Sequence, residues 1–142
     1  MKRPDKEIMQ EKLSALQSYY RELTELQHIT YEEYCSSNLY RRTVERLLQL
    51  IVETATDTNN MVLKMLGKET PTDYYSSFIK MAECNVFPME FALEIAPSTG
   101  MRNIIVHEYQ KIDDRLVHAS IRETLQYYLR YLEYLDNFLE KN

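Results

Sequence analysis

Residues 38–66 read NLYRRTVERLLQLIVETATDTNNMVLKML, and this stretch decides the fold. Its apolar positions recur at helical spacing and form one stripe, made of Val44, Leu48, Ile51, Ala55, Val62 and Leu66. Such spacing predicts an amphipathic α-helix with this stripe facing a core. The opposite, solvent-facing side is expected to carry Arg42, Gln49, Glu53, Thr56 and Asn60. Gly67 is expected to end the helix in a left-handed conformation, which glycine adopts without steric cost.

The chain on either side of this helix also reads as helical. Helices are expected over residues 4–27, 72–84 and 88–96, with a short helical turn near residues 31–35 between the first two long ones. A break with a hydroxyl cap is expected at residues 98–100, followed by a further helix. The last helix is expected to start at Asp113 and to run nearly to the end of the chain. With no strand alternation and no internal repeat, we predict an all-α antiparallel helical bundle of about four to five main helices.

Composition narrows the class of protein further. The chain has 142 residues and is expected to form one domain, residues 1–142. Only two glycines are present, which excludes the glycine-rich loops that bind nucleotide phosphates. Cys35 and Cys84 have no metal-ligand spacing, so we expect reduced thiols and no metal. No apolar run is long enough for a membrane span, and no targeting signal is recognised, so a cytoplasmic protein without membrane contact is expected.

The segment with the strongest chemical signal is residues 102–109, RNIIVHEY, which has the form R-x4-H-x-Y. Histidine serves as acid and base near neutral pH. Arginine binds phosphate oxygens in a bidentate way and always carries a charge. On one helix, Arg102 and Tyr109 are expected to share a face, with Asn103 and His107 on the face beside it. The pattern favours phosphoryl chemistry.

A structural interpretation competes with this one, because an Arg and a His at this spacing also occur together by chance. A lone helical histidine is more often structural than catalytic, and we assign structural roles to His28 and His118. The net charge of −5 also argues against bulk electrostatic binding of nucleic acid.

The segment resembles the R-x4-6-H signature of HEPN-domain ribonucleases, in the R-x4-H-x-Y form that is typical of HepT-type toxins. The resemblance covers essentially the whole chain. It includes the helix with residues 40–46 (YRRTVER) and its later Glu53, then Asp113 and the long C-terminal helix. The polar residue expected directly after the arginine is present as Asn103.

The resemblance implies a metal-independent endoribonuclease without cofactors, the toxin of a toxin–antitoxin pair. Such enzymes act as homodimers, with the two motifs facing each other across a cleft. Arg102 and His107 are then catalytic, Asn103 supports them, and the ribose 2′-OH attacks the scissile phosphate. The resemblance implies an RNA substrate, and a transfer RNA, a messenger RNA or a broader pool of RNA would fit the same site.

Tyr109 has a separate implied role. In HepT-type pairs, an antitoxin with a minimal nucleotidyltransferase fold adds AMP to the motif tyrosine and silences the nuclease. By resemblance, Tyr109 is the acceptor. The alternative is a tyrosine that only makes a hydrogen bond within the dimer interface.

Two further groups of residues have two interpretations each. The first group either forms a local basic lining for RNA or belongs to an ordinary solvated surface, and consists of Arg41, Arg42, Arg46, Lys111 and Arg115. A second apolar stripe on the last helix indicates either a dimer interface or a broad core face, and consists of Tyr127, Tyr131, Tyr134 and Phe138.

For the protein as a whole, two alternatives to the nuclease remain. One is a non-catalytic HEPN-like module that binds a nucleotide or a partner protein. The other is a helical adaptor in which the motif arises by chance.

Overall fold

The computed structural model describes residues 3–142, with side chains from residue 5 onward. Within that range it has no strand. The elements are α1 (Arg3–Thr24), α2 (Tyr31–Ser36), α3 (Asn38–Met65), α4 (Tyr74–Glu83), α5 (Met89–Ile95), α6 (Ser98–His107), the 3-10 helix η1 (Tyr109–Lys111) and α7 (Asp114–Lys141). The five longest helices, α1, α3, α4, α6 and α7, correspond to the main helices expected, and the prediction of an all-α helical bundle is confirmed.

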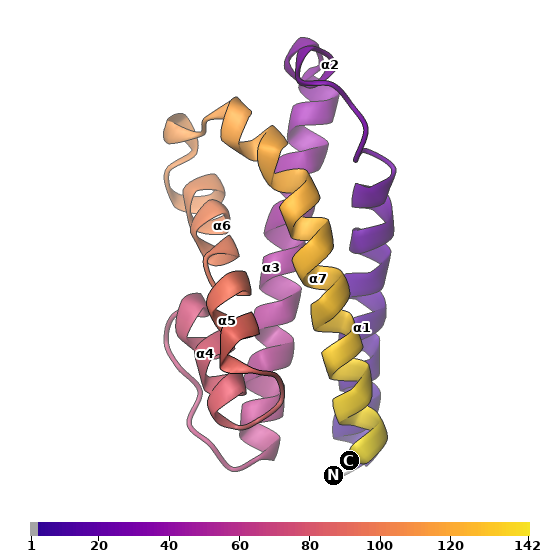
Figure 1. Cartoon of the computed structure of the whole chain (residues 1–142), viewed down its shortest axis with the longest axis vertical. Helices are drawn as coiled ribbons and strands as arrows, with labels where there is room; N and C mark the ends of the chain where they lie inside the picture. Colours follow the sequence, from indigo (N-terminus) through magenta and orange to yellow (C-terminus); the bar gives the residue numbers. More distant parts are fainter. Residues whose placement is uncertain (1–2) are drawn as a thin grey trace.

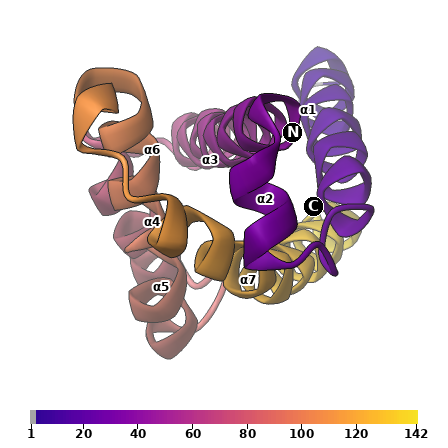
Figure 2. The ribbon, with the colours of Figure 1, turned by 90° about the horizontal axis from the view of Figure 1, so that it is seen from above.

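The helices form two groups on either side of α3. Figure 1 shows α1, α3 and α7 side by side along the long axis, with α4, α5 and α6 on the other flank of α3. The helix α2 crosses one end of the bundle (Figure 2). Both α3 and α7 start at that end, whereas α1 and α6 run toward it, and both chain termini lie at the opposite end (Figure 1). None of the helices in the described range has the length and hydropathy that a membrane crossing requires.

The helix α3 is buried on more sides than its sequence predicts. The expected stripe is correct for Val44, Ile51 and Val62, which are fully buried. Leu66 lies beyond the end of the helix and is exposed, so its assignment to the stripe was wrong. Thr56, expected on the solvent face, is buried. The physical reason is that α3 contacts α1, α2, α4, α6 and α7, so little of its surface is left for water.

Both ends of the α4 region depend on residues with positive φ. Gly67 has φ +74° and follows α3, as predicted. The amide of Lys68 donates to the Leu63 carbonyl and that of Gly67 to the Lys64 carbonyl, which is the pattern of a Schellman cap. Asn85, with φ 64°, ends α4 in the same way. The Gly67 cap ends α3 before the chain returns to pack α4 against α3, and the Asn85 cap ends α4 before α5.

Side-chain caps start four of the helices, α2, α3, α4 and α7. Thr30 and Glu33 form a capping box at α2, each side chain accepting a hydrogen bond from the other's backbone amide. Asp113 caps α7 by accepting from the amide of Arg115 at 2.9 Å, which confirms the predicted start. His118, on the first turns of α7, lies 2.7 Å from the Ile29 carbonyl through Nε2 and packs against two tyrosine rings of α2. The structural role assigned to His118 is therefore correct.

The second apolar stripe of α7 is used within the chain. Tyr131 is fully buried, and its ring contacts those of Phe78 and Phe87. Tyr134 packs against Phe87 and Phe91, with ring centroids 5.9 and 5.0 Å apart. The stripe covers α4, α5 and their connecting loop. Of the two interpretations, the broad core face is the one that the structure supports, so the stripe provides no argument for a dimer.

We expect Tyr131→Phe to lower the free energy of unfolding by about 1–3 kcal/mol, because buried acceptors then lose their donor. The Tyr131 hydroxyl lies 2.6 Å from Asn59 Oδ1 and 3.0 Å from the Ala55 carbonyl. Chemical denaturation measures the change. Tyr127→Phe is the matched control, because within the described residues the hydroxyl of this half-buried tyrosine makes no hydrogen bond. Equal losses in the two variants would contradict the prediction.

Candidate functional site

The helix that carries the motif starts earlier than expected. α6 begins at Ser98, and its preceding residue, Pro97, is itself helical, so α5 and α6 are joined by a tight helical turn without a side-chain cap. The expected hydroxyl cap at residues 98–100 was wrong. The hydroxyl of Thr99 donates instead to the Ala96 carbonyl, and the Ser98 and Tyr128 hydroxyls lie 2.7 Å apart. The side chain of Ser98 thereby ties the start of α6 to α7.

Arg102 is held by side chains from two other helices. Its Nε and Nη2 both donate to Glu53 Oε2 on α3, at 2.9 and 2.7 Å. Its guanidinium lies over the ring of Tyr74 on α4, 4.3 Å from the ring centroid. The third nitrogen, Nη1, donates to Asn103 Oδ1 at 3.2 Å. The side chain is only 13% exposed, so the guanidinium sits in a fixed position with one edge toward the surface.

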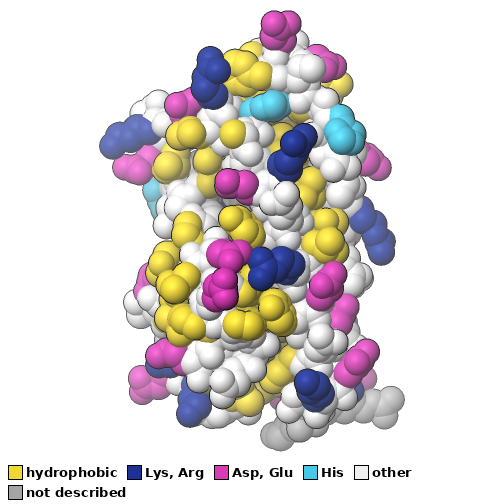
Figure 3. Space-filling view, viewed as in Figure 1, with side chains coloured by type: hydrophobic (Ala, Val, Ile, Leu, Met, Phe, Trp, Pro, Cys, Tyr) yellow, Lys and Arg dark blue, Asp and Glu magenta, His cyan; other side chains and the backbone are white. Residues whose placement is uncertain are grey.

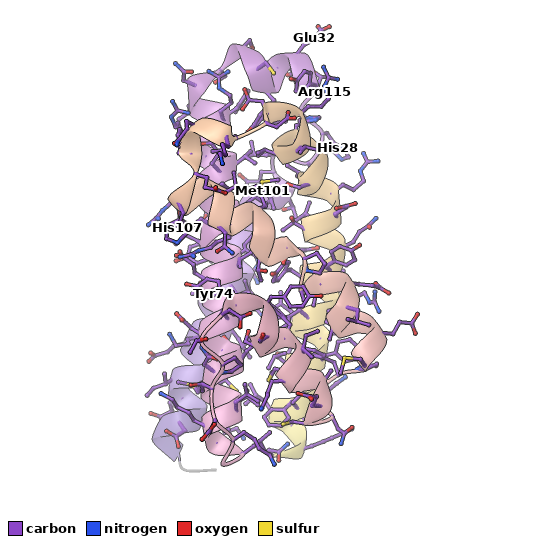
Figure 4. The ribbon with its side chains drawn as sticks, turned by 90° about the vertical axis from the view of Figure 1, so that its left-hand side faces the viewer. His28, Glu32, Tyr74, Met101, His107 and Arg115 are labelled. Carbon is purple, nitrogen blue, oxygen red and sulfur yellow. The ribbon has the colours of Figure 1, made fainter. Side chains whose placement is uncertain are left out.

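His107 and Asn103 lie on the outer side of α6. Both are exposed, and within the described residues His107 makes no hydrogen bond or ion pair. His107 is the last residue of α6, and Figure 4, which looks onto this flank, shows it at the outer edge of the molecule. Ile105 is buried and anchors the helix to the core. The site thus combines a fixed cation with an accessible acid–base group.

Tyr109 does not share a helix with Arg102, contrary to expectation. α6 ends at His107, because Glu108 leaves helical geometry with φ −136° and ψ 45°, and Tyr109 opens the 3-10 turn. The phenol is turned back onto α3, where its hydroxyl donates to Glu45 Oε1 at 2.6 Å. Arg42 Nη1 donates to the same hydroxyl, and its guanidinium lies 5.5 Å from the centroid of the Tyr109 ring. The motif residues therefore fall into two neighbouring groups. One is the pair Arg102 and His107 on α6, and the other is the phenol of Tyr109 with its partners on α3.

The electrostatics of Tyr109 follow from this contact. The hydrogen bond to the Glu45 carboxylate raises the pKa of Tyr109, because ionisation would place two negative charges together, and Arg42 opposes the shift. Glu45 is only 4% exposed, whereas Tyr109 is 43% exposed. A buried carboxylate thus lies beneath an accessible hydroxyl.

The five basic residues expected to line an RNA site do not form one free positive surface. Arg42 is engaged with Tyr109 and Glu45, Lys111 pairs with Glu108 at 3.2 Å, and Arg115 stacks on the Tyr31 ring. The side chain of Arg41 donates to the Cys35 carbonyl and to Asn38 at the α2–α3 junction. Arg46 is exposed, and it alone of the five has no such partner in the described part of the chain.

Three partners of the motif were missed as site residues from sequence: Glu53, Tyr74 and Glu45. The only local signal was a glutamate at residue 45 and another at residue 53, on the helix whose apolar stripe was recognised. Neither spacing nor charge indicates which distant residue will meet them. Among the described residues no cluster of three or more His, Cys, Asp or Glu side chains has a geometry that holds a metal ion.

Comparison with known proteins gives consistent matches. The model of the family "Ribonuclease HepT-like" matches residues 9–135. The tRNA nuclease HepT of Aphanizomenon flos-aquae is 33% identical over 132 residues, which cover 93% of this chain and 90% of that protein. A putative RNase of Archaeoglobus fulgidus is 31% identical over 90 residues, 63% of this chain and 67% of that protein.

A solved structure shares the fold. A tri-AMPylated Shewanella oneidensis HEPN toxin in complex with an MNT antitoxin has a TM-score of 0.82 to this chain. The two sequences are 18% identical, and the match covers 96% of this chain and 99% of the toxin.

We expect Glu45→Gln to lower the pKa of Tyr109 toward its ordinary value near 10. The neutral amide no longer repels the phenolate. In the wild type, the folded protein binds the Tyr109 proton more tightly than the unfolded chain does, and this adds to the free energy of unfolding. The contribution is fully present below the pKa of Tyr109 in the unfolded chain and is lost as the pH rises through its pKa in the folded protein. Ring-labelled tyrosine NMR over about pH 9–12 follows the titration, with the Tyr109 signal assigned by Tyr109→Phe. An unchanged pKa in the Gln variant would show that Glu45 does not govern this hydroxyl.

Proposed function

The chain belongs to the family of HepT-like ribonucleases, and from this we propose that it is the toxin of a toxin–antitoxin pair, a cytoplasmic, metal-independent endoribonuclease. The observation that carries the proposal is the pairing of a fixed Arg102 guanidinium with an exposed His107 on one helix. The HepT relative from Aphanizomenon flos-aquae is a tRNA nuclease, which makes transfer RNA the first substrate to test.

The proposed reaction uses the RNA's own 2′-OH. Its oxygen attacks the adjacent phosphorus, the bond to the 5′-oxygen breaks, and a 2′,3′-cyclic phosphate remains. His107 accepts the 2′-OH proton or delivers a proton to the leaving oxygen. Arg102 stabilises the charge that grows on the phosphoryl oxygens, using the edge that Glu53 leaves toward the surface, with Asn103 beside it.

A homodimer supplies what one chain lacks. Strand cleavage needs both a base and an acid, and this flank of the described chain presents one histidine, His107. A second copy facing the first contributes a second Arg102 and a second His107. Val106, on the same face of α6, is 37% exposed, and an apolar side chain amid polar site residues suits a covered surface. Figure 3 shows further hydrophobic side chains gathered over the middle of the face that carries α5.

Basic side chains at the α2 end of the bundle extend the RNA contact in this proposal. Arg46 has no hydrogen-bond or ion-pair partner among the described residues and is the side chain proposed to meet phosphate. Arg41, Arg42, Lys111 and Arg115 are each engaged within the chain and add positive charge around it. This region lies beside η1, close to the site. The contact is local, which is compatible with the acidic net charge of −5.

Tyr109 is the proposed point of control. We propose that a minimal nucleotidyltransferase antitoxin transfers AMP to its hydroxyl, as the AMPylated state of the Shewanella oneidensis toxin suggests for a protein of the same fold. The exposed ring and the nearby Arg42 suit an adduct that carries phosphate. A bulky anionic adduct next to Arg102 and His107 would obstruct RNA.

Purified protein is expected to cleave RNA in the presence of EDTA and to leave 2′,3′-cyclic phosphate ends. Arg102→Ala should lower the rate about 10²–10³-fold, because phosphoryl charge loses its donor. His107→Ala should lower it about 10²–10⁴-fold, because proton transfer is lost. Labelled transfer RNA and messenger RNA, resolved on gels with end-group analysis, give both the rate and the product.

His28→Ala is the matched control, because it removes an exposed histidine far along the chain from the motif and should leave the rate unchanged. No cleavage by the wild type, or equal cleavage by His107→Ala, would refute the nuclease mechanism. Cleavage that stops in EDTA would refute metal independence alone.

Co-expression with a minimal nucleotidyltransferase antitoxin is expected to add the mass of one or more AMP units and to abolish RNA cleavage. The added mass should be missing in Tyr109→Phe, which lacks the acceptor oxygen. Intact-mass spectrometry makes the measurement. An unmodified wild type, or a modified Tyr109→Phe, would remove Tyr109 as the acceptor.

A further inference from the structure

The Tyr109 hydroxyl has both a proton acceptor and a cation already in contact with it. It donates to Glu45 Oε1 at 2.6 Å and accepts from Arg42. The Arg42 guanidinium and the Glu45 carboxylate also pair with each other at 3.7 Å. The hydroxyl hydrogen is directed at Glu45, and one lone pair of the oxygen accepts the hydrogen bond from Arg42. The Tyr109 oxygen therefore has one lone pair left. Tyr109 is 43% exposed. An incoming electrophile would therefore react with this remaining lone pair.

We propose that Glu45 is the general base for modification of Tyr109, so that this chain itself supplies part of the catalysis by which it is silenced. The inference rests on the proposed adenylylation. In the step, the Tyr109 oxygen attacks the α-phosphorus of ATP bound to the antitoxin. The new oxygen–phosphorus bond forms as the bond to the β-phosphate's bridging oxygen breaks and pyrophosphate leaves. The phenol proton moves to Glu45 Oε1.

A base is needed because the phenol is not ionised in advance. The Glu45 contact raises the pKa of Tyr109, so the hydroxyl keeps its proton until attack begins. A neutral hydroxyl is a weak nucleophile, and an adjacent base activates it by taking the proton as the bond forms. Glu45 meets the geometric requirement for a base, since 2.6 Å is within direct proton-transfer distance. Its burial keeps competing water away from the carboxylate.

Charge balance also favours this destination for the proton. Before the reaction, Arg42 and Glu45 carry opposite charges and the phenol is neutral. The adduct adds a phosphodiester with one negative charge at the same oxygen. If Glu45 kept its charge, a buried carboxylate would face that anion at low dielectric. With the proton on Glu45, the group remains neutral overall, because Arg42 then pairs with the phosphodiester.

The test measures modification rates with purified antitoxin, ATP labelled at the α-phosphate and magnesium, at several concentrations of the toxin chain. Glu45→Gln keeps the shape and an acceptor oxygen but cannot take a proton. We expect kcat for modification to fall about 10²–10⁴-fold with little change in the KM for the toxin. The matched control is Glu108→Gln, which removes an exposed carboxylate at the residue next to Tyr109, one that pairs with Lys111. It should be modified at the wild-type rate.

Equal kcat for Glu45→Gln and wild type would overturn the proposal, as would a defect confined to KM. If circular dichroism shows that Glu45→Gln is unfolded, Glu45→Asp and Glu45→Asn are compared instead, since they have equal length and only one has a proton acceptor. Faster modification of the Asp variant supports the proposal, and equal rates overturn it. A wild type that is never modified defeats the proposed adenylylation itself, which separates the two failures.

Discussion

The constraint on which the rest of the structure depends is the burial of α3 among five other helices. Polar side chains on the enclosed faces of such a helix are kept from water, and an unpaired buried polar group costs about 1–3 kcal/mol. Each of three polar residues on α3 is matched by a different element. Asn59 meets Tyr131 of α7, Glu53 meets Arg102 of α6, and Glu45 meets Tyr109 of η1. The core and the candidate site are thus consequences of the same requirement.

The need to pair Glu53 explains why Arg102 is fixed in place while His107 is exposed to solvent. Arg102 enters the edge of the core to satisfy Glu53 and stacks on Tyr74, so its guanidinium is fixed before any ligand arrives. His107 is five residues further on, at the end of the helix, and is in contact with solvent. Electrostatic stabilisation of a phosphate gains from a donor that does not reorganise. Proton transfer instead requires an imidazole that is accessible to substrate.

The end of α6 separates the proposed catalytic pair, Arg102 and His107, from the proposed modification site at Tyr109. Because Glu108 breaks the helix, Tyr109 turns onto α3 and lies against Glu45 and Arg42 instead of beside Arg102. A continuous helix would have placed the phenol on the arginine's own face. The break gives the Tyr109 hydroxyl a chemical environment of its own, while its ring remains within the short segment that follows Arg102 and His107.

The sequence by itself determined what depends on near neighbours along the chain. The stripe through Val44, Ile51 and Val62, the left-handed Gly67 and the Asp113 cap are all local, and all were found as predicted. The R-x4-H-x-Y spacing identified the segment, but the partners of its residues lie 49 and 64 positions away, at Glu53 and Glu45. Only the packing of α6 and η1 on α3 decided those pairs, since periodicity carries no information about which distant side chains meet. The same packing decided that Tyr131 belongs to the core and that Thr56 is buried.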